Sequence, residues 1–395
     1  MQRQATVSRF PVPDVPATID DLPRIHDWFR RMREERPVRR GELYGQECWN
    51  LYRYDDVFTA LTDYERFSSH VRDVGDELIR VRALAIDPPA HHRLRSVVNQ
   101  AFTRRTVNLL TDRVAELVAG LLDAVRHRGE MDLSAEFAMP LPALVIAEVL
   151  GVPRHDWDIF QRWAAGAPTL RGFSTPAAHS VRRQMHDYFA AMLADRRSSP
   201  REDLVSALAT AEVEGEPLTD REVVSLCSLV LFAGQETTRH LLVNIVLALD
   251  EHPEARSRLL LDQSLVPTAV EEVLRTKPPV WYVIRIARTE LELGGRRIPK
   301  GRFVVPWAAS ANRDPSRFPD PDTFDVARSP NHHLTFSHGI HFCVGAPLAR
   351  LEACVALPML LERLPNLRVV RTRPLPVHAA ASVFPMELPV TFDAS

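Results

Sequence analysis

The spacing of apolar residues predicts a chain that is mostly helical. Through residues 107–213, apolar side chains recur three and four positions apart, as at Val114, Leu117, Val118 and Leu121. This interval places them on one face of a helix, the face that packs into a core. We therefore expect a set of packed helices in the middle of the chain, with core residues rather than site residues along these stripes.

A longer helix is predicted to begin at Thr219 and to end near Glu251. Thr219 and Glu222 fit a capping box, and the His-Pro pair after Glu251 does not continue a helix. At 1.5 Å per residue, such a helix would be roughly 45 Å long. Its interior contains Gly234 and two threonines, residue types that disfavour a helix interior. We therefore expect something other than local preference to decide the structure there.

Strand-like segments lie near both ends of the chain. Residues 25–35 predict a helix, residues 48–54 a strand, and residues 55–61 a helix that Asp55 could cap. We expect residues 68–86, which lack a clear period, to form a long loop over the site.

The C-terminal part of the chain adds further strand signals. Residues 291–301 alternate around a Gly-Gly pair, as in a hairpin. Residues 379–392 are strand-like around Pro385, with a turn predicted at Val383 and Phe384. The fold class is therefore mainly α with a minor β-sheet region, and we expect one domain over residues 1–395.

Composition narrows the partners that the chain could have. With 49 basic and 51 acidic side chains, the formal net charge is −2, which favours neither nucleic acid nor a polybasic membrane contact. The N-terminal residues lack the apolar core of a signal peptide or membrane anchor. The four cysteines are too scattered for a zinc pattern and too few for a disulfide scaffold. We expect a cytoplasmic protein without a membrane anchor.

One short stretch, residues 336–345, carries the clearest chemistry. It reads Phe-Ser-His-Gly-Ile-His-Phe-Cys-Val-Gly and runs into a helix-like segment with an early proline. Gly339 and Gly345 would permit backbone angles closed to other residues, so that a tight loop could surround the sulfur of Cys343. A position ahead of a helix lowers the pKa of a thiol and favours the thiolate. Taken alone, such a cysteine is more often a small buried apolar residue.

The spacing of Phe336, Gly339, His341 and Gly345 around Cys343 resembles the haem-ligand loop of the cytochrome P450 family. The resemblance extends over nearly the whole chain and implies the P450 fold, with the long helix crossing the haem. It implies haem b, iron protoporphyrin IX, with Cys343 as the thiolate ligand of the metal. It also implies a lid at residues 166–176 and a soluble bacterial member of the family.

Further motifs follow the same resemblance. The segment Asp-Pro-Pro-Ala-His-His-Arg-Leu-Arg matches a family pattern that places His91 and Arg95 on a haem propionate. Buried carboxylates need cationic or hydrogen-bonding partners, and Arg285 and His341 are the further candidates. Without the resemblance, a histidine and an arginine four apart would more often form a solvated helix face.

The segment Ala233-Gly234-Gln235-Glu236-Thr237 matches the family's oxygen-binding part of the long helix. By resemblance, Gly234 makes room for dioxygen, Glu236 and Thr237 deliver protons, and Ala233 is a further residue of the catalytic segment. Cleavage of an O–O bond requires protons at the outer oxygen, which a carboxyl group can resupply through a hydroxyl. The alternative is packing, with Gly234 allowing a close helix approach and Glu236 solvated.

Glu272 and Arg275 share a helix face three residues apart, which by itself is a weak signal. Together with Arg328, they match the family's buried charge network behind the cysteine loop. Residues near these motifs predict an apolar substrate pocket, and the candidates are Leu231, Phe232, Val283, Ile284, Val383 and Phe384.

These patterns predict a haem-thiolate monooxygenase that hydroxylates or epoxidises a hydrophobic small molecule, with a role in secondary metabolism. It would use dioxygen and two electrons from a ferredoxin and a ferredoxin reductase. Two alternatives stay open: a peroxide-driven peroxygenase, whose relatives usually replace the acid and alcohol pair, and a non-catalytic haem-binding sensor. The sequence does not select the substrate.

Overall fold

The computed structural model describes residues 16–43, 45–70, 86–165, 176–379, 381 and 383–395. The chain forms two compact units, each built from separate stretches of sequence. The first unit contains residues 1–74, 268–343 and 371–387, and the second contains residues 75–267, 344–370 and 388–395. The predicted loop at 68–86 and the predicted lid at 166–176 fall mostly outside the described residues. The expectation of one domain stays a prediction.

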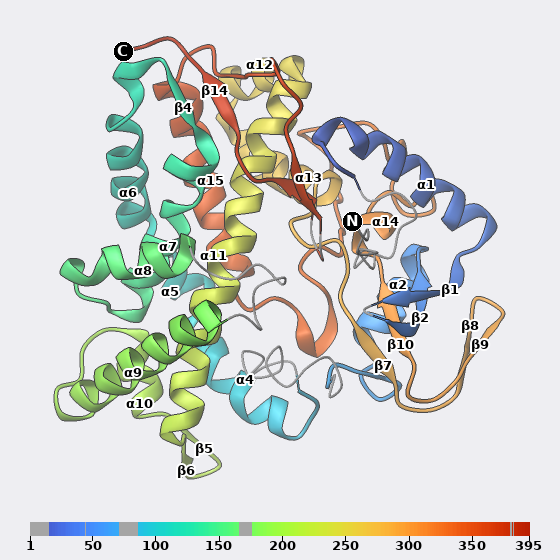
Figure 1. Cartoon of the computed structure of the whole chain (residues 1–395), viewed down its shortest axis with the longest axis horizontal. Helices are drawn as coiled ribbons and strands as arrows, with labels where there is room; N and C mark the ends of the chain where they lie inside the picture. Colours follow the sequence, from blue (N-terminus) through green and yellow to red (C-terminus); the bar gives the residue numbers. More distant parts are fainter. Residues whose placement is uncertain (1–15, 44, 71–85, 166–175, 380, 382) are drawn as a thin grey trace, which may run out of the picture. The chain divides into compact units, whose positions relative to one another are not determined.

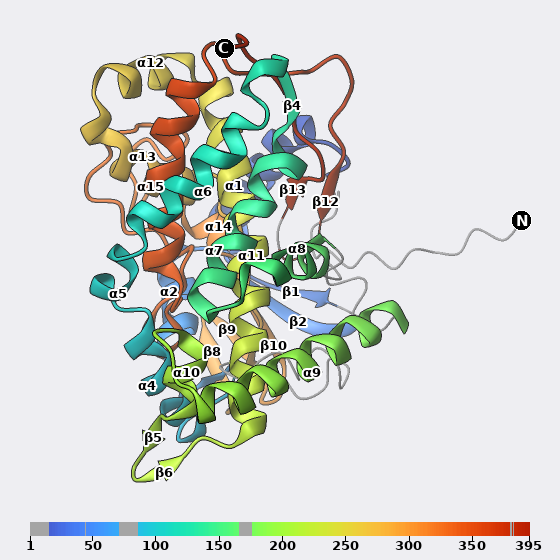
Figure 2. The ribbon, with the colours of Figure 1, turned by 90° about the vertical axis from the view of Figure 1, so that its left-hand side faces the viewer.

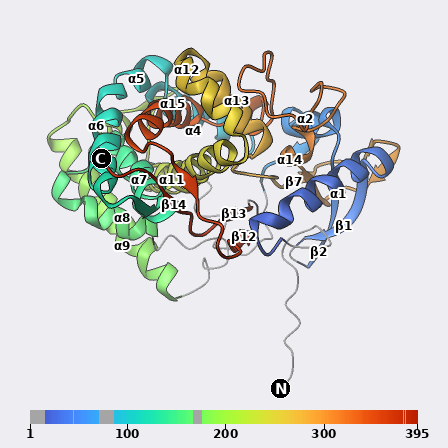
Figure 3. The ribbon, with the colours of Figure 1, turned by 90° about the horizontal axis from the view of Figure 1, so that it is seen from above.

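The first unit is built around a five-stranded sheet with the order β1-β2-β10-β7-β3. The strands are β1 (Val38–Leu43), β2 (Gln46–Leu51), β10 (Phe303–Pro306), β7 (Arg285–Ala287) and β3 (Phe67–Ser68). The β10–β2 pair is parallel, and the other pairs are antiparallel. The helix α1 (Leu22–Glu35) lies beside β1 and β2 (Figure 3). Its predicted position is confirmed.

Aromatic side chains fill the core of this sheet. Phe29 of α1 packs against the rings of Tyr52, Trp281 and Trp307, with ring centroids 5.2 to 6.1 Å apart. Trp307 is fully buried, and its indole Nε1 donates a hydrogen bond to Asn50 Oδ1 at 2.9 Å. The core therefore joins α1 to two segments that are distant in the sequence. Asn50 and Trp307, which represent these segments, are 257 positions apart.

The helix α2 (Tyr54–Thr62) follows β2 as predicted, but its cap is different. Arg53 occupies the N-cap position, and no side chain at that position accepts a hydrogen bond from the helix. Instead, the amide of Tyr54 donates to Asp314 Oδ2 at 2.8 Å. The predicted cap by Asp55 is wrong, because a carboxylate 260 residues away takes that place and leaves Asp55 paired with Arg317 at 2.6 Å.

Two hairpins and several short helices complete the first unit. The hairpin β8 (Leu291–Leu293) and β9 (Arg296–Ile298) confirms the prediction for residues 291–301. The strands β12 (Val377–Ala379) and β13 (Val383–Pro385) pair antiparallel, with His378 opposite Phe384. The predicted turn at Val383 and Phe384 is wrong, because both residues belong to β13. The remaining helices are α13 (Val266–Thr276), α14 (Ala308–Ala311), and the short 3-10 helices η1 (Ile19–Asp21) and η6 (Gly339–His341).

The second unit is a set of helices around α11 (Asp220–Glu251) (Figure 1). The predicted capping box is present, since Glu222 N donates to Thr219 Oγ1 at 3.3 Å and Thr219 N to Glu222 Oε2 at 2.8 Å. The side chains of α11 pack against α7 (Pro140–Leu150), α9 (Pro176–Ser198) and α15 (Ala346–Arg363). The helix α6 (Thr111–Asp123) runs beside α15 (Figure 2). The predicted start and end of the long helix are confirmed.

The other elements of the second unit are short. They are the helices α4 (Ala90–Ala101), α5 (Arg104–Asn108), α8 (Trp157–Ala165), α10 (Leu204–Ala209) and α12 (Pro253–Leu261), the 3-10 helices η2 (Arg126–Arg128), η4 (Arg154–Asp156) and η5 (Gln263–Leu265), the π-helix η3 (Ser134–Ala138), and the strands β4 (Glu130–Asp132), β5 (Glu212–Val213), β6 (Glu216–Pro217), β11 (Arg368–Val369) and β14 (Pro389–Thr391). The strands β11, β14 and β4 form a three-stranded sheet in that order. Over the described residues, we find no helix with the length and apolar character needed to span a bilayer.

Candidate functional site

The loop that precedes Cys343 is closed by its own backbone. The amide of Cys343 donates to the carbonyl of Phe336 at 2.8 Å, and the amide of Phe342 donates to the carbonyl of Gly339 at 3.1 Å. Between them, the imidazole Nδ1 of His338 accepts from Gly339 N at 3.0 Å. The chain thus turns back on itself over the eight residues 336–343, and α15 starts at Ala346, three residues after Cys343.

Gly339 is required by this loop, whereas Gly345 is not. Gly339 has φ +67°, and a Cβ there would lie 3.0 Å from Thr62 Cα and 3.2 Å from the carbonyl oxygen of Leu61. Gly345 is the N-cap of α15 with φ −79°, an angle that other residues adopt. The prediction of a special backbone angle at Gly345 is therefore wrong, and the loop turns at Gly339, packed directly on the end of α2.

Cys343 differs from the other cysteines in exposure. Cys48 and Cys227 are buried, Cys354 is half-buried, and Cys343 is exposed; none of the four forms a disulfide. Burial raises the pKa of the Cys48 and Cys227 thiols to about 12, which keeps them protonated. An accessible sulfur at the end of a tight loop is the arrangement that a metal ligand needs, so Cys343 is the one cysteine placed to act as one.

The predicted charge network is assembled behind this loop. Arg275 Nε and Nη2 donate to the two carboxylate oxygens of Glu272 at 2.8 and 2.7 Å, and both side chains are fully buried. Arg328 Nε donates to Glu272 Oε1 at 3.1 Å, and Asn331 Nδ2 donates to Oε2 at 3.1 Å. One buried carboxylate thus receives hydrogen bonds from three side chains and from the amide of Asp325. The sequence identified every member of this network except Asn331 and the Asp325 amide.

The first unit also contains Arg285 and four of the predicted substrate-pocket residues. Arg285 is buried at the start of β7, where its Nη1 donates to the carbonyl of Ile284 at 3.1 Å. Val383 belongs to the core cluster around Phe29, and Ile284 packs against that cluster. Val283 packs against a second core cluster, to which β1, β2 and β10 also contribute, and Phe384 is buried with its ring centroid 5.6 Å from that of His378. These four apolar residues are core or core-flanking positions within their own unit.

In the second unit, the site residues of α11 are arranged around a back-bonded threonine. Thr237 Oγ1 donates to the carbonyl of Ala233 at 2.8 Å, one turn earlier in the helix. Gly234 faces α7, and a Cβ there would meet Ile146 Cδ1 at 2.7 Å. This contact supports the packing explanation for the glycine, since α7 and α11 approach closely at this point. Leu231 is buried and Phe232 is half-buried on the same helix.

Glu236 is half-buried, so its surroundings influence the charge of its carboxyl group. Burial raises the pKa of the Glu236 carboxyl group, and the positive charge of Arg239 acts against that rise. Because the pKa is raised, the carboxyl group binds a proton more readily than an exposed glutamate does. A carboxyl group with a raised pKa, followed in the sequence by a residue with a hydroxyl group, is suited to proton transfer.

His91 and Arg95 lie on α4 as predicted, one turn apart. His91 is buried, and its pKa is lowered to about 4 by burial and by the charges of Arg95 and His92. The imidazole is therefore neutral and has one N–H to donate. Arg95 Nε donates to Asn99 Oδ1 at 2.7 Å, so the guanidinium is held along α4.

The predicted site residues divide between the two units. The first unit contains Phe336, Gly339, His341, Cys343, Arg285, Glu272, Arg275, Arg328, Val283, Ile284, Val383 and Phe384, and the second contains His91, Arg95, Leu231, Phe232, Ala233, Gly234, Glu236, Thr237 and Gly345. The structure thus brings together the cysteine loop with its charge network, and separately the acid and alcohol pair of α11.

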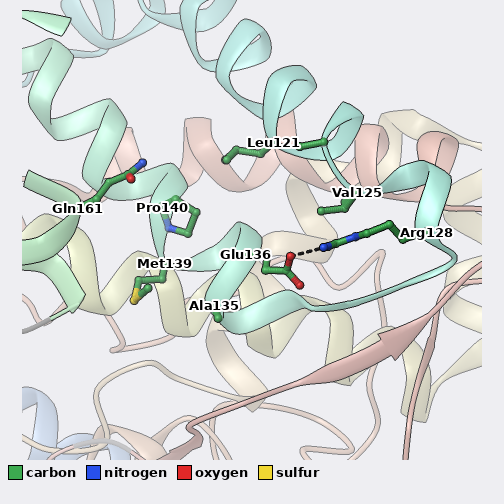
Figure 4. A pocket seen from close by; sticks show the side chains of 9 residues that line it. Leu121, Val125, Arg128, Ala135, Glu136, Met139, Pro140 and Gln161 are labelled. Atoms are coloured by element: carbon green, nitrogen blue, oxygen red, sulfur yellow. Dashed lines mark hydrogen bonds and ion pairs between the residues drawn. The ribbon is translucent and has the colours of Figure 1, made fainter. Parts of the chain in front are cut away.

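A pocket of about 400 Å³ in the second unit contains none of these residues. Its walls come from α6, η3, α7 and α8 (Figure 4), and Arg128 and Glu136 form an ion pair at its edge. The lining side chains include Leu121, Met139 and Gln161. This pocket is not the predicted site.

Comparison with known proteins identifies the family. A family model described as cytochrome P450 matches residues 145–376, more than half of the chain. The chain is 40% identical over 364 residues to the cyclomarin C epoxidase CymV of Salinispora arenicola, covering 89% of this chain and 92% of that protein. The chain belongs to the cytochrome P450 family. The P450 monooxygenase PikC of Streptomyces venezuelae is 39% identical over 378 residues, covering 92% of this chain and 90% of that protein.

The fold class is confirmed by solved structures of P450 proteins. The structure of PksS, a P450 of the Bacillus subtilis bacillaene polyketide synthase, has a TM-score of 0.88 and 36% sequence identity, covering 94% of this chain and 98% of that chain. The predicted P450 fold, mainly α with a minor β region, is therefore correct. The protein is a P450 monooxygenase, an oxidoreductase, and the family implies a haem cofactor and hydrophobic substrates.

Sequence reasoning missed two polar residues of this P450 that the structure makes prominent. Glu352 of α15 is fully buried, its Oε2 has no hydrogen-bond partner among the described residues, and burial raises the pKa of its carboxyl group well above the ordinary value. Burial therefore favours the protonated, uncharged form of its carboxyl group. Ser134 is fully buried in η3 and accepts two hydrogen bonds from Arg239. A glutamate among the apolar residues of a helix was the available signal for Glu352, whereas nothing in the sequence marks Ser134.

Proposed function

We propose that the protein is a haem-thiolate monooxygenase in which Cys343 ligates haem b and residues of α11 supply protons. The observation that carries this proposal is the cysteine loop, in which an exposed thiol follows a backbone turn that only Gly339 accommodates. A thiolate-bound haem supplies the iron at which dioxygen is activated, since the thiolate donates electron density that favours O–O cleavage. The charge network of Glu272 supports the same proposal, because it braces the segment that leads into the loop.

The donor set fits a haem that carries two carboxylates. Arg285 provides a buried guanidinium, and the neutral imidazole of His91 provides an N–H donor. His341 in the cysteine loop and Arg95 on α4 add two more groups that could contact a propionate. Because buried carboxylates are stable only with such partners, we assign these four residues to the propionates.

This proposal is tested by identifying the ligand of the haem iron from the absorption spectrum. We expect the reduced carbon monoxide adduct of the purified protein to have the red-shifted absorption of a thiolate-ligated haem, and Cys343→His to lose it. Cys354→Ser is the matched control, because Cys354 is also accessible in part but lies on α15. A parent protein that absorbs like a histidine-ligated globin would refute the assignment.

Glu236 and Thr237 would deliver protons to the oxygen-binding side. Glu236 has the raised pKa of an acid that accepts a proton from water, and Thr237 offers a hydroxyl on the next residue. The hydroxyl would donate its proton outward and recover one from the carboxyl group. The presence of both residues also favours dioxygen over peroxide as the oxidant, since a peroxide-driven enzyme needs no relay.

We expect Thr237→Ala to retain haem and substrate binding but to divert electrons from dioxygen to hydrogen peroxide. The measurement is product formed and peroxide released per NAD(P)H consumed, with surrogate redox partners. Ser228→Ala is the control, because Ser228 Oγ donates to the carbonyl of Val224 at 2.8 Å, the same i−4 contact that Thr237 makes on the same helix. An unchanged ratio of product to NAD(P)H in Thr237→Ala would contradict the relay.

We propose the substrate class and the electron donor from the chemistry of the family and from the similarity to known relatives. Relatives include an epoxidase for cyclomarin C and a mycinamicin IV hydroxylase/epoxidase. We propose a hydrophobic small molecule of secondary metabolism as substrate, hydroxylated or epoxidised in the cytoplasm. Electrons would come singly from a ferredoxin and its reductase. A screen of apolar compounds for a spin-state change in the haem spectrum would identify the substrate class.

A further inference from the structure

Arg239 lies one turn after Glu236 on α11, but its guanidinium binds a residue of another element. Its Nε and Nη2 atoms donate to Ser134 Oγ at 3.2 and 2.8 Å. Residues three apart on a helix are neighbours, so the arginine side chain is long enough to reach the Glu236 carboxylate. In the structure, both of these N–H groups point instead to a hydroxyl on η3.

Ser134 is itself held in place from several sides. Its amide donates to Asp132 Oδ1 at 2.9 Å, and its carbonyl accepts from the amide of Met139 at 3.0 Å. The same Asp132 oxygen accepts from the amide of Leu388 at 2.9 Å. Ser134 is fully buried at the start of a π-helix, an element that occurs frequently at functional sites. The backbone of Ser134 is therefore held in place, and its buried hydroxyl oxygen accepts the hydrogen bonds of Arg239.

We propose that Ser134 holds the Arg239 guanidinium back from Glu236, which makes Arg239 a positioning residue for the acid of the proton relay. This inference rests on the proposed role of Glu236. A direct ion pair would occupy the carboxylate oxygens and keep them unprotonated. A helix without the arginine would leave a desolvated carboxyl group that binds its proton too firmly. In the observed structure, the guanidinium is near Glu236 but bound to Ser134, so its effect on the carboxyl group is intermediate between these two cases. The carboxyl group can therefore both take up and release a proton.

The charged groups around the pair are few. Among the described residues, Arg239 is the charged side chain whose field acts on Glu236, and Asp132 on β4 is the other acid that acts on Arg239. The titration of Glu236 is therefore governed by burial and by the position of one guanidinium. A variant that changes the position or the charge of that guanidinium should therefore change the pKa of Glu236.

The experiment measures the Glu236 titration through folding stability. The free energy of unfolding of the haem-loaded protein is followed against pH for the parent, Ser134→Ala and Arg239→Ala, each with and without Glu236→Gln. The difference within each pair isolates Glu236. Because the folded pKa is raised, the contribution of Glu236 to stability falls as pH rises above its unfolded pKa, and levels off above the folded one.

We expect the pH at which the Glu236 contribution levels off to be lower in Ser134→Ala than in the parent, because the Arg239 guanidinium becomes free to pair with Glu236. In Arg239→Ala this pH should be higher, because the opposing charge is lost. Arg239→Gln should behave like Arg239→Ala, since it keeps an amide donor for Ser134 without the charge. Arg221→Ala, which removes an exposed arginine from the first turn of the same helix, should move nothing. Shifts in the same direction for Ser134→Ala and Arg239→Ala, or no shift in either, would overturn the inference.

A second measurement separates this inference from the proposed function. The pH profile of peroxide release during turnover should move with the titration in each variant, and Arg239→Lys should restore part of it. If Glu236→Gln leaves the ratio of product to NAD(P)H unchanged, the proposed proton relay is wrong. The pH dependence of the unfolding free energy still decides whether Ser134 and Arg239 set the pKa of Glu236. Ser134→Gly provides the same test should Ser134→Ala fail to fold.

Discussion

Arg275→Ala is expected to yield a protein that does not incorporate haem. The substitution removes both hydrogen bonds to the Glu272 carboxylate and those to the carbonyls of Asn312, Pro321 and Thr323, all within 3.0 Å. Glu272 is left buried with one of its two arginine partners, Arg328. Breaking a buried pair in this way costs about 3–5 kcal/mol, a large part of the 5–15 kcal/mol by which a typical protein is stable.

The measurement is haem bound per chain after expression with ample haem supply, together with the free energy of unfolding. Arg297→Ala is the matched control. The Arg297 Nη2 to Glu290 Oε2 distance is 2.7 Å, equal to that between Arg275 Nη2 and Glu272 Oε1, but both partners are exposed. An exposed pair contributes little to stability because solvent screens it, so the control should keep its haem. A normally loaded Arg275→Ala protein would show that the network does not hold the cysteine loop.

Gly339→Ala should also abolish haem binding, through the shape of the cysteine loop rather than through charge. The backbone at this position has φ +67°, which costs an alanine about 1–2 kcal/mol. The added Cβ would also lie 3.0 Å from Thr62 Cα and 3.2 Å from Leu61 O. These are backbone atoms at the end of α2, which cannot turn aside as a side chain can. The loop must therefore move, and Cys343 moves with it.

Gly295→Ala separates the two contributions. Gly295 has φ +69°, and a Cβ there would meet nothing within 4 Å. This control carries the same backbone cost in the β8–β9 hairpin without the collision, so it should lose stability but retain its haem. The readouts are the unfolding free energy and the spectrum of the reduced carbon monoxide adduct. Equal haem loading in the two variants would mean that the loop tolerates a shift against α2.

Sequence reasoning predicted well where function demands a fixed local pattern. The long helix from Thr219, its capping box and its end at Glu251 followed from local signals, and all are present. The Glu272, Arg275 and Arg328 network was also found, because the family resemblance linked segments that no local rule connects. The haem ligand and the relay stay predictions that the spectroscopic and turnover experiments above will decide.

Errors arose where a distant part of the chain replaced a local partner. Asp55 is a good capping residue by type, but the amide it would have capped is bound by Asp314, 260 positions further on. Gly345 is followed by a helix, which suggested a special backbone angle, yet the helix simply begins there. Val383 and Phe384 were expected in a turn, whereas pairing with Val377–Ala379 makes them a strand.

The sequence by itself determined the family and the helical class, and it predicts the residue types of the site, because haem ligation and proton transfer require particular side chains at nearly fixed intervals. The tertiary structure alone decided that Gly234 packs against Ile146, that burial raises the pKa of the Glu352 carboxyl group, and that Ser134 accepts hydrogen bonds from Arg239. The physical reason is that burial and hydrogen bonding depend on which segments meet in space. A residue's charge and contacts therefore belong to the folded chain, whereas its chemical capacity can be read from its type.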